Sequence, residues 1–176
     1  PYRRPFSLYN LIMSTNYNLP DRKHNRLAEY DYSTAGLYFI TICVLHRKHL
    51  LSTVESDQVH LKKCGEICLE IWKSLPERFP AVTLDEFVIM PNHIHGIIVL
   101  DNSTNTTTLS AVVGAYKSLV SREYYTWFKE KHGSYIGKIW QRSFHDHVIR
   151  NQRSLNAVRE YIHHNPANWA DDPENQ

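Results

Sequence analysis

Three segments of the chain carry the dense mixture of apolar, β-branched and aromatic residues that is typical of β-strands. These segments are residues 37–45 (LYFITICVL), 81–90 (AVTLDEFVIM) and 93–100 (HIHGIIVL). β-Branched and aromatic side chains favour the pleated strand, so each segment predicts one. The last two are separated only by the turn residues of MPN, which predicts that they pair as an antiparallel hairpin.

Three other segments show the three- and four-residue spacing of apolar positions that marks an amphipathic helix. The first lies within residues 60–79, where Pro76 is expected to limit its length. The second covers residues 109–132. The third covers residues 154–165, with Ser154 expected as its N-cap.

A fourth strand is expected over residues 139–149 (IWQRSFHDHVI), and residues 101–108 are expected to form a polar loop. The predicted order is strand, helix, strand, strand, helix, strand, helix. This order is typical of an α+β, ferredoxin-like sandwich, in which two helices cover one face of a four-stranded antiparallel sheet. An extra C-terminal helix follows, and the second face of the sheet is expected to be open to a ligand.

The 176 residues fit a single folded unit, which we expect at residues 29–170. Residues 1–28 are polar and rich in turn formers. They predict an N-terminal arm or extension, and Met13 is a candidate start of the natural chain. Residues 171–176 are expected to form an acidic tail.

Charge is distributed unevenly along the chain. The formal net charge is only +2, but residues 111–160 contain nine lysines and arginines against four acidic residues. A local basic surface attracts nucleic acid, although a solvated helix face explains the same pattern equally well.

Cysteine usage and hydropathy bear on the cellular compartment. The three cysteines are an odd number without CxxC spacing, which argues against a disulfide framework and against a zinc knuckle. No apolar run approaches the roughly 18 residues that a membrane span needs. We therefore expect a cytoplasmic protein with no membrane partner.

His93 and His95 are the main candidates for chemistry. Side chains two residues apart in a strand project from one face, while the intervening Ile94 projects from the other. Two neutral imidazoles on a rigid strand suit a shared divalent metal. The alternative is a pair of polar residues on a solvent-facing strand, and two ligands alone do not complete a metal site.

The last predicted helix offers candidates that would complete the site. Tyr161 and Asn165 lie four residues apart and so share one helix face, which His164 nearly shares. The Asn165 carboxamide oxygen suits Mg²⁺ or Mn²⁺, whereas His164 would favour a softer metal. A phenol is mostly protonated at neutral pH, so Tyr161 would need a neighbouring metal to become a nucleophile. Most of the 11 tyrosines are expected to be packing residues instead.

A second same-face pair, His145 and His147, competes for the metal. The residue between them is Asp146, not an apolar residue. If Phe144 and Val148 point into the core, both histidines lie on the open face, where they could contact DNA or bind a metal weakly.

Other common catalytic motifs are missing from the sequence. It contains no Gly-rich phosphate loop, Walker motif, Ser-His-Asp elbow or Rossmann fingerprint. The adjacent carboxylates Asp85 and Glu86 would diverge on a strand. A metal combined with a tyrosine is the remaining chemical hypothesis.

Several motifs, taken together and in order, resemble those of a known family. PNHIH (residues 91–95) resembles the HUH motif, His-hydrophobic-His, of single-tyrosine transposases. YKSLVSR, IWQRSFHDHVIRN and REYIHHNP resemble the later blocks of that family, and YDYSTAGLYFITICVLHRKHLL resembles the entry strand of its REP-associated tyrosine transposase branch. The resemblance covers roughly residues 29–170.

The resemblance implies a ferredoxin-like fold and cleavage of hairpin-bearing single-stranded DNA. It further implies dependence on Mg²⁺ or Mn²⁺, a covalent 5′-phosphotyrosine intermediate, a free 3′-OH, and strand transfer in the cytoplasm of a bacterium, at the nucleoid when DNA is bound. It assigns His93 and His95 as metal ligands, Tyr161 as the nucleophile and Asn165 as the amide-type third ligand. The residues expected near DNA are Lys117, Arg122, Arg142, His147 and Arg150. His145 stands where an aromatic residue is common, which leaves its role open.

Two other functions remain open from the sequence. A non-catalytic, hairpin-binding module on the same fold predicts DNA binding without covalent attachment. A metal-dependent hydrolase using activated water predicts cleavage that survives loss of the Tyr161 hydroxyl. The chain is expected to be a monomer or a homodimer, with a monomer favoured when the last helix packs on its own domain.

Overall fold

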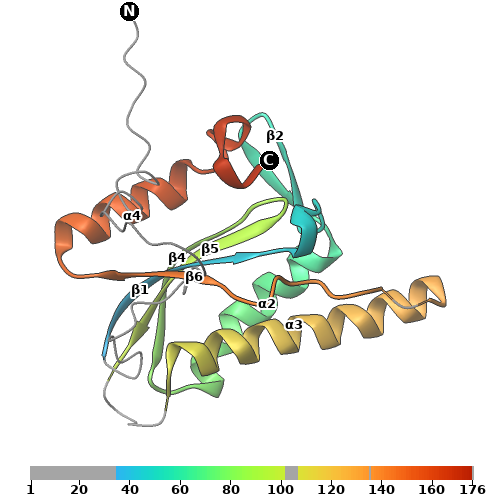
Figure 1. Cartoon of the computed structure of the whole chain (residues 1–176), viewed down its shortest axis with the longest axis horizontal. Helices are drawn as coiled ribbons and strands as arrows, with labels where there is room; N and C mark the ends of the chain where they lie inside the picture. The colour runs from blue at the N-terminus through green and yellow to red at the C-terminus, as the bar shows by residue number, and fades with distance from the viewer. Residues whose placement is uncertain (1–34, 102–106, 135, 176) are drawn as a thin grey trace, which may run out of the picture.

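The computed structural model describes residues 35–101, 107–134 and 136–175 (Figure 1). The expected arm at residues 1–28, and most of the expected loop at residues 101–108, lie outside the described residues. Within the described part, a four-stranded antiparallel sheet carries helices on its faces and is accompanied by a two-stranded hairpin. The predicted α+β, ferredoxin-like class is confirmed.

The two candidate histidines, His93 and His95, lie on an interior strand of the central sheet. Its strands, in the spatial order β4-β5-β1-β6, are β4 (Val82–Ile89), β5 (His93–Leu100), β1 (Gly36–Cys43) and β6 (His145–Ile149). Each neighbouring pair is antiparallel, and His93 and His95 of β5 lie opposite Cys43 and Thr41 of β1. Because β5 is flanked on both sides, the imidazoles are held by a fully paired backbone.

The helices divide between the two faces of the sheet. Figure 1 shows α2 (Lys63–Arg78) and α3 (Leu109–His132) on one face and α4 (Gln152–His164) on the other. The larger core lies under α2 and α3, where Ile40 and Ile94 of the sheet are fully buried. The expected hairpin of β4 and β5 and the expected helices are thus present.

Helix α4 covers part of the face that was expected to be open. Its stripe of Leu155, Val158 and Ile162 packs on Phe39 and Ile97 of the sheet, forming a second, smaller core. The expectation of an open face is therefore wrong along this strip, because an apolar stripe at three- and four-residue spacing must be buried somewhere. An ion pair further anchors the helix at the edge strand, with Arg159 Nε 2.8 Å from Asp85 Oδ1.

The fourth strand is shorter than predicted. β6 begins at His145, and the backbone of residues 139–144 pairs with the chain after β1 through an isolated bridge between Val44 and Trp140. The Trp140 indole donates instead to Lys117 O of α3, at 3.1 Å. Hydrophobic composition predicted a strand here. The side chains of Ile139 and Trp140 are indeed buried in the larger core, but the backbone that carries them does not continue the strand.

A hairpin of β2 (Ser52–Glu55) and β3 (Gln58–Leu61) was not predicted. Its two turn residues, Ser56 and Asp57, both have positive φ, at 48° and 63°. Positive φ at both positions is the geometry of a tight hairpin turn, which usually reveals itself by Asn-Gly or Asp-Gly. The turn residues used here give a much weaker sequence signal.

One detail of the predicted helix ends is wrong. Helix α4 is capped by Asn151, whose side-chain oxygen accepts from the Ser154 amide at 2.8 Å, so Ser154 lies in the first turn instead of capping it. Pro76 lies in the last turn of α2, which ends at Arg78, in agreement with the expected limit on its length. Among the described residues, no helix is long and apolar enough to cross a membrane.

Candidate active site

The alternation of β5 places His93 and His95 on the face covered by α4. Both side chains are fully buried, while Ile94 between them enters the opposite core. The two imidazole rings lie 4.4 Å apart, measured between their centroids. The expected same-face pair is therefore present, but it is buried under the C-terminal part of the chain and is not a solvent-facing surface.

Each imidazole is held by its Nδ1 atom. His93 Nδ1 lies 2.8 Å from Asn92 Oδ1, and His95 Nδ1 lies 2.9 Å from Thr41 Oγ1. The Asn92 amide nitrogen donates to Glu174 O at 2.6 Å, so the Asn92 oxygen is left to accept a hydrogen bond from His93 Nδ1–H. An imidazole that donates through Nδ1 keeps its lone pair on Nε2, the form in which histidine binds metals.

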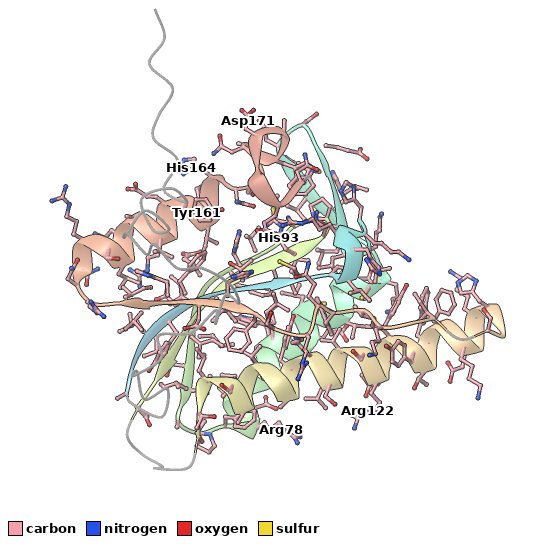
Figure 2. The ribbon with its side chains drawn as sticks, viewed as in Figure 1. Arg78, His93, Arg122, Tyr161, His164 and Asp171 are labelled. Atoms are coloured by element: carbon pink, nitrogen blue, oxygen red, sulfur yellow. The ribbon has the colours of Figure 1, made fainter. Side chains whose placement is uncertain are left out.

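Helix α4 brings Tyr161 to the histidine pair. Tyr161 Oη lies 3.3 Å from His95 Nε2, and the Phe39 ring meets the Tyr161 ring edge-on at 6.0 Å. Figure 2 shows Tyr161 and His93 facing the same region between α4 and the sheet. The position follows from the helix stripe, because burying Ile162 places the neighbouring Tyr161 over the sheet near the start of β5.

Asn165 and Asp172 complete a buried polar cluster with the histidines. Asn165 Nδ2 donates to Asp172 Oδ2 at 2.9 Å, and the same oxygen lies 4.0 Å from His93 Nε2. Ligand atoms of His93, His95 and Asp172 all lie within 4.8 Å of one another. Asp172 belongs to the segment set apart in the sequence as an acidic tail, yet it is only 6% exposed.

Burial controls the protonation of these groups. It lowers the pKa of His95 to about 3, and it lowers the pKa of His93 well below its usual value, with further contributions from His95 and Arg47. Burial also raises the pKa of Asp172. The imidazoles are thus neutral at physiological pH and able to bind a metal.

The buried cluster fits a divalent metal ion. His93 Nε2 and Asn165 Oδ1 are buried and have no hydrogen-bond partner among the described residues. An unpaired buried polar atom is destabilising, and a cation would satisfy both of these acceptors. The donor set of imidazole nitrogens and hard oxygens suits Mg²⁺ or Mn²⁺.

The other candidate histidines, His145, His147 and His164, do not belong to the buried cluster of His93, His95 and Asp172. His164 is exposed at the end of α4 (Figure 2). Its Nδ1 lies 2.8 Å from Glu160 O. His145 and His147 are half-buried on β6, and His147 lies opposite Phe39. Burial, followed by Arg150, lowers the pKa of His147. Because His147 lies opposite Phe39, which packs under α4, the His147 side chain lies on the face covered by α4.

Lys117 is half-buried and does not project freely toward a ligand. Its ammonium group lies 2.7, 3.2 and 3.3 Å from the carbonyl oxygens of Gln141, Arg142 and Ser143. Three carbonyls use the three protons of a lysine ammonium, so Lys117 fixes the course of residues 141–143. Burial lowers its pKa.

The remaining basic candidates are exposed. Arg122 projects from α3, as Figure 2 shows, and pairs with Glu123 at 2.9 Å. Arg142 and Arg150 lie before and after β6 and are both solvent-exposed. The structure thus brings Tyr161 and Asn165 to the histidines, whereas these arginines lie outside the buried cluster.

Sequence reasoning missed three residues that shape the site: Thr41, Asn92 and Asp172. Asn92 precedes the first histidine directly, and Thr41 is the polar position of an otherwise apolar strand, so both carried a local signal. Asp172 carried none, because its approach depends on how the chain turns after α4 through the short helix η2 (Trp169–Asp171).

Comparisons with known proteins agree with this combination of fold and site. The family model described as "Transposase IS200 like" matches residues 37–165, a range that runs from β1 to the end of α4. The chain therefore belongs to the IS200-like transposase family, a class of DNA-processing proteins. The sequence resemblance to single-tyrosine transposases is confirmed.

Individual relatives point to one branch of this family. An uncharacterized protein of Haemophilus influenzae is 33% identical over 91% of this chain and 97% of its own length. A second H. influenzae protein, named "Putative REP-associated tyrosine transposase", is 28% identical over 77% of this chain and 73% of its own length. A solved REP-associated tyrosine transposase bound to a REP hairpin shares the fold, with a TM-score of 0.58 and 21% identity over 84% of this chain and 81% of that one.

Proposed function

We propose that this protein cleaves single-stranded DNA beside a hairpin and transfers the cut end to another strand through a covalent bond to Tyr161. The observation that carries the proposal is the 3.3 Å distance between Tyr161 Oη and His95 Nε2. A phenol held this close to a buried pair of neutral imidazoles is placed to attack a phosphate bound at the same site.

The proposed reaction exchanges one phosphodiester bond for another. The Tyr161 oxygen forms a bond to phosphorus while the bond from phosphorus to the 3′ oxygen breaks. The proton lost by the phenol is balanced by the proton gained by the departing 3′-OH, and the 5′ end stays on the tyrosine. Attack by a 3′-OH on this phosphotyrosine restores the phenol and joins the strands, so no nucleotide cofactor is required.

His93, His95 and Asn165 are the proposed ligands of a Mg²⁺ or Mn²⁺ ion. When bound, such an ion would withdraw charge from the scissile phosphate and stabilise the charge that develops in the transition state. Asn92 and Thr41 fix the orientation of the two imidazoles. Helix α4 fixes the phenol against the same face, so all of these groups come from one chain. This supports a monomer as the active unit.

Hairpin DNA is the proposed substrate, partly because the matched solved structure contains a REP hairpin. Arg142, His147 and Arg150 lie along β6 and its flanks and would contact phosphates. Lys117 would act indirectly by holding the loop that presents Arg142. Arg122 would add positive charge on α3.

The proposal is tested by incubating the protein with single-stranded hairpin DNA and Mn²⁺ or Mg²⁺, then looking for a DNA–protein adduct in denaturing gels. The wild type should form the adduct and Tyr161→Phe should lose it, because only the attacking oxygen is removed. Tyr125→Phe is the matched control. This variant also removes one phenolic oxygen. Tyr125 lies on α3, and its hydroxyl donates to Gly137 O at 3.1 Å. The variant should leave the adduct unchanged.

Two outcomes would overturn the proposal. DNA binding by the wild type without any adduct would indicate a hairpin-binding module. Cleavage that persists in Tyr161→Phe would indicate a hydrolase that uses activated water. Both variants should bind hairpin DNA with wild-type affinity, which separates lost chemistry from lost folding.

A further inference from the structure

The carboxylate of Asp172 faces the proposed metal site from the C-terminal end of the chain. Its Oδ2 lies 2.9 Å from Asn165 Nδ2 and 4.0 Å from His93 Nε2, and its Oδ1 accepts from the Glu174 amide at 2.7 Å. A carboxylate oxygen has two acceptor positions, so each oxygen of Asp172 can still bind a cation after it accepts one of these hydrogen bonds. The side chain is therefore directed at the histidines by its own hydrogen bonds.

A second observation points to a cation at this place. His93 Nε2 and Asn165 Oδ1 are unpartnered acceptors on side chains that are 0% and 2% exposed. A negative carboxylate buried next to two unpaired acceptors is an unfavourable arrangement unless a positive charge joins them. The Arg47 guanidinium forms an ion pair with Glu174, two residues after Asp172.

We propose that Asp172 is an anionic ligand of the ion, in addition to His93, His95 and Asn165. This inference rests on the proposed metal site and adds to it a residue from outside the strand and helix that carry the family motifs. One carboxylate would give the site a negative charge that the two imidazoles and the carboxamide lack. A charged oxygen ligand favours a hard divalent ion such as Mn²⁺ or Mg²⁺.

The chain after α4 is built to hold Asp172 in this position. Glu174 is 4% exposed, its carbonyl oxygen accepts from Asn92 Nδ2, and its carboxylate pairs with Arg47 and accepts from Cys43 Sγ at 3.3 Å. Asn92 in turn holds His93. The C-terminal turn and the first histidine are thus joined through one carboxamide, so metal binding and docking of this turn should stabilise each other.

The test is Mn²⁺ binding to the full chain without DNA, measured by the loss of the free-ion paramagnetic resonance signal. Asp172→Asn should bind at least about tenfold more weakly, since loss of even an outer-shell partner weakens metal sites by about 10- to 100-fold. Asp171→Asn is the matched control, because it removes one negative charge from the adjacent exposed residue. It should bind Mn²⁺ as the wild type does.

A second measurement keeps the inference testable if Asp172→Asn alters packing. Mn²⁺ should slow amide hydrogen exchange over residues 168–175 in the wild type and in Asp171→Asn, but not in Asp172→Asn. Equal Mn²⁺ affinity in Asp172→Asn and Asp171→Asn would overturn the inference and leave the proposed function intact. Wild-type protein that binds no Mn²⁺, or binds it equally after His95→Ala, would overturn the metal site itself.

Discussion

At the scale of single residues, the site depends on two histidines that are buried as neutral groups. Their Nδ1 atoms are engaged by Asn92 and Thr41, and their Nε2 atoms are directed toward Tyr161 and Asp172. Burying a titratable group in a fixed protonation state makes stability depend on pH, because the unfolded chain can take up protons that the native state excludes.

This pH dependence can be measured on the metal-free protein. His95 has a native pKa of about 3 against a usual value near 6.5, so its contribution to stability is present above pH 6.5 and is lost as pH falls toward 3. The His93 pKa is lowered in the same direction. In the presence of a metal chelator, the free energy of unfolding measured with urea should therefore decrease as pH is lowered from 7 to 5.5. The decrease should be up to about 1.4 kcal/mol per pH unit for each histidine.

The control for this measurement is His95→Gln, whose stability should fall less steeply over the same interval. Equal slopes for the variant and the wild type would contradict the assignment of a buried neutral imidazole. The interval stops at pH 5.5 because Asp172, with its raised pKa, acts with the opposite sign nearer the usual carboxyl range. For that group, stability is present at low pH and is lost as pH rises.

At the scale of elements, β5 connects the site to the larger core through Gly96. A Cβ atom built at this position would lie 2.6 Å from Cη2 of Trp72, whose ring stacks on Phe87 at 4.3 Å. The tryptophan of α2 thus packs directly against the backbone of the strand, one residue after His95. The absence of a side chain at residue 96 allows this close packing of helix and sheet.

Gly96→Ala should therefore destabilise the protein by about 1–3 kcal/mol, because the two stacked rings must shift to admit the methyl group. Chemical unfolding at constant pH measures the effect. Gly114→Ala in α3 is the matched control, since its Cβ would meet nothing within 4 Å. It should be neutral or stabilising by up to about 1 kcal/mol, because alanine favours the helix. Destabilisation of equal size in both variants would contradict the packing argument.

Most elements could be predicted because their signals are local. The apolar, β-branched composition of residues 93–100 predicted β5 with its observed bounds, and the two-residue repeat of a strand predicted the common face of both histidines. The four-residue spacing of Tyr161 and Asn165 predicted their common helix face. The hairpin of β2 and β3 escaped prediction because its turn uses Ser56 and Asp57 without glycine. The approach of Asp172 to His93 joins residues 79 positions apart in sequence, and no local pattern encodes it.

At the scale of the whole molecule, the two faces of the sheet have different tasks. The face under α2 and α3 holds the larger hydrophobic core, and the face under α4 holds the histidines, the tyrosine and the end of the described chain. Leu155, Val158 and Ile162 run along the length of α4 and hold it on the sheet, while Tyr161 and Asn165 near its C-terminal end face the polar cluster. The smaller core and the site meet at Phe39, whose ring contacts both His95 and Tyr161, so packing under α4 also positions the site.

The proposed reaction depends on the Tyr161 oxygen becoming attached to DNA. The most direct test is to trap the adduct on hairpin DNA, digest it with trypsin and identify the modified peptide by mass spectrometry. Cleavage after Arg159 releases a peptide in which Tyr161 is the single tyrosine. The expected product is a 5′-phosphate linked to Tyr161. Attachment to any other residue, or through a 3′-phosphate, would rule out the proposed reaction.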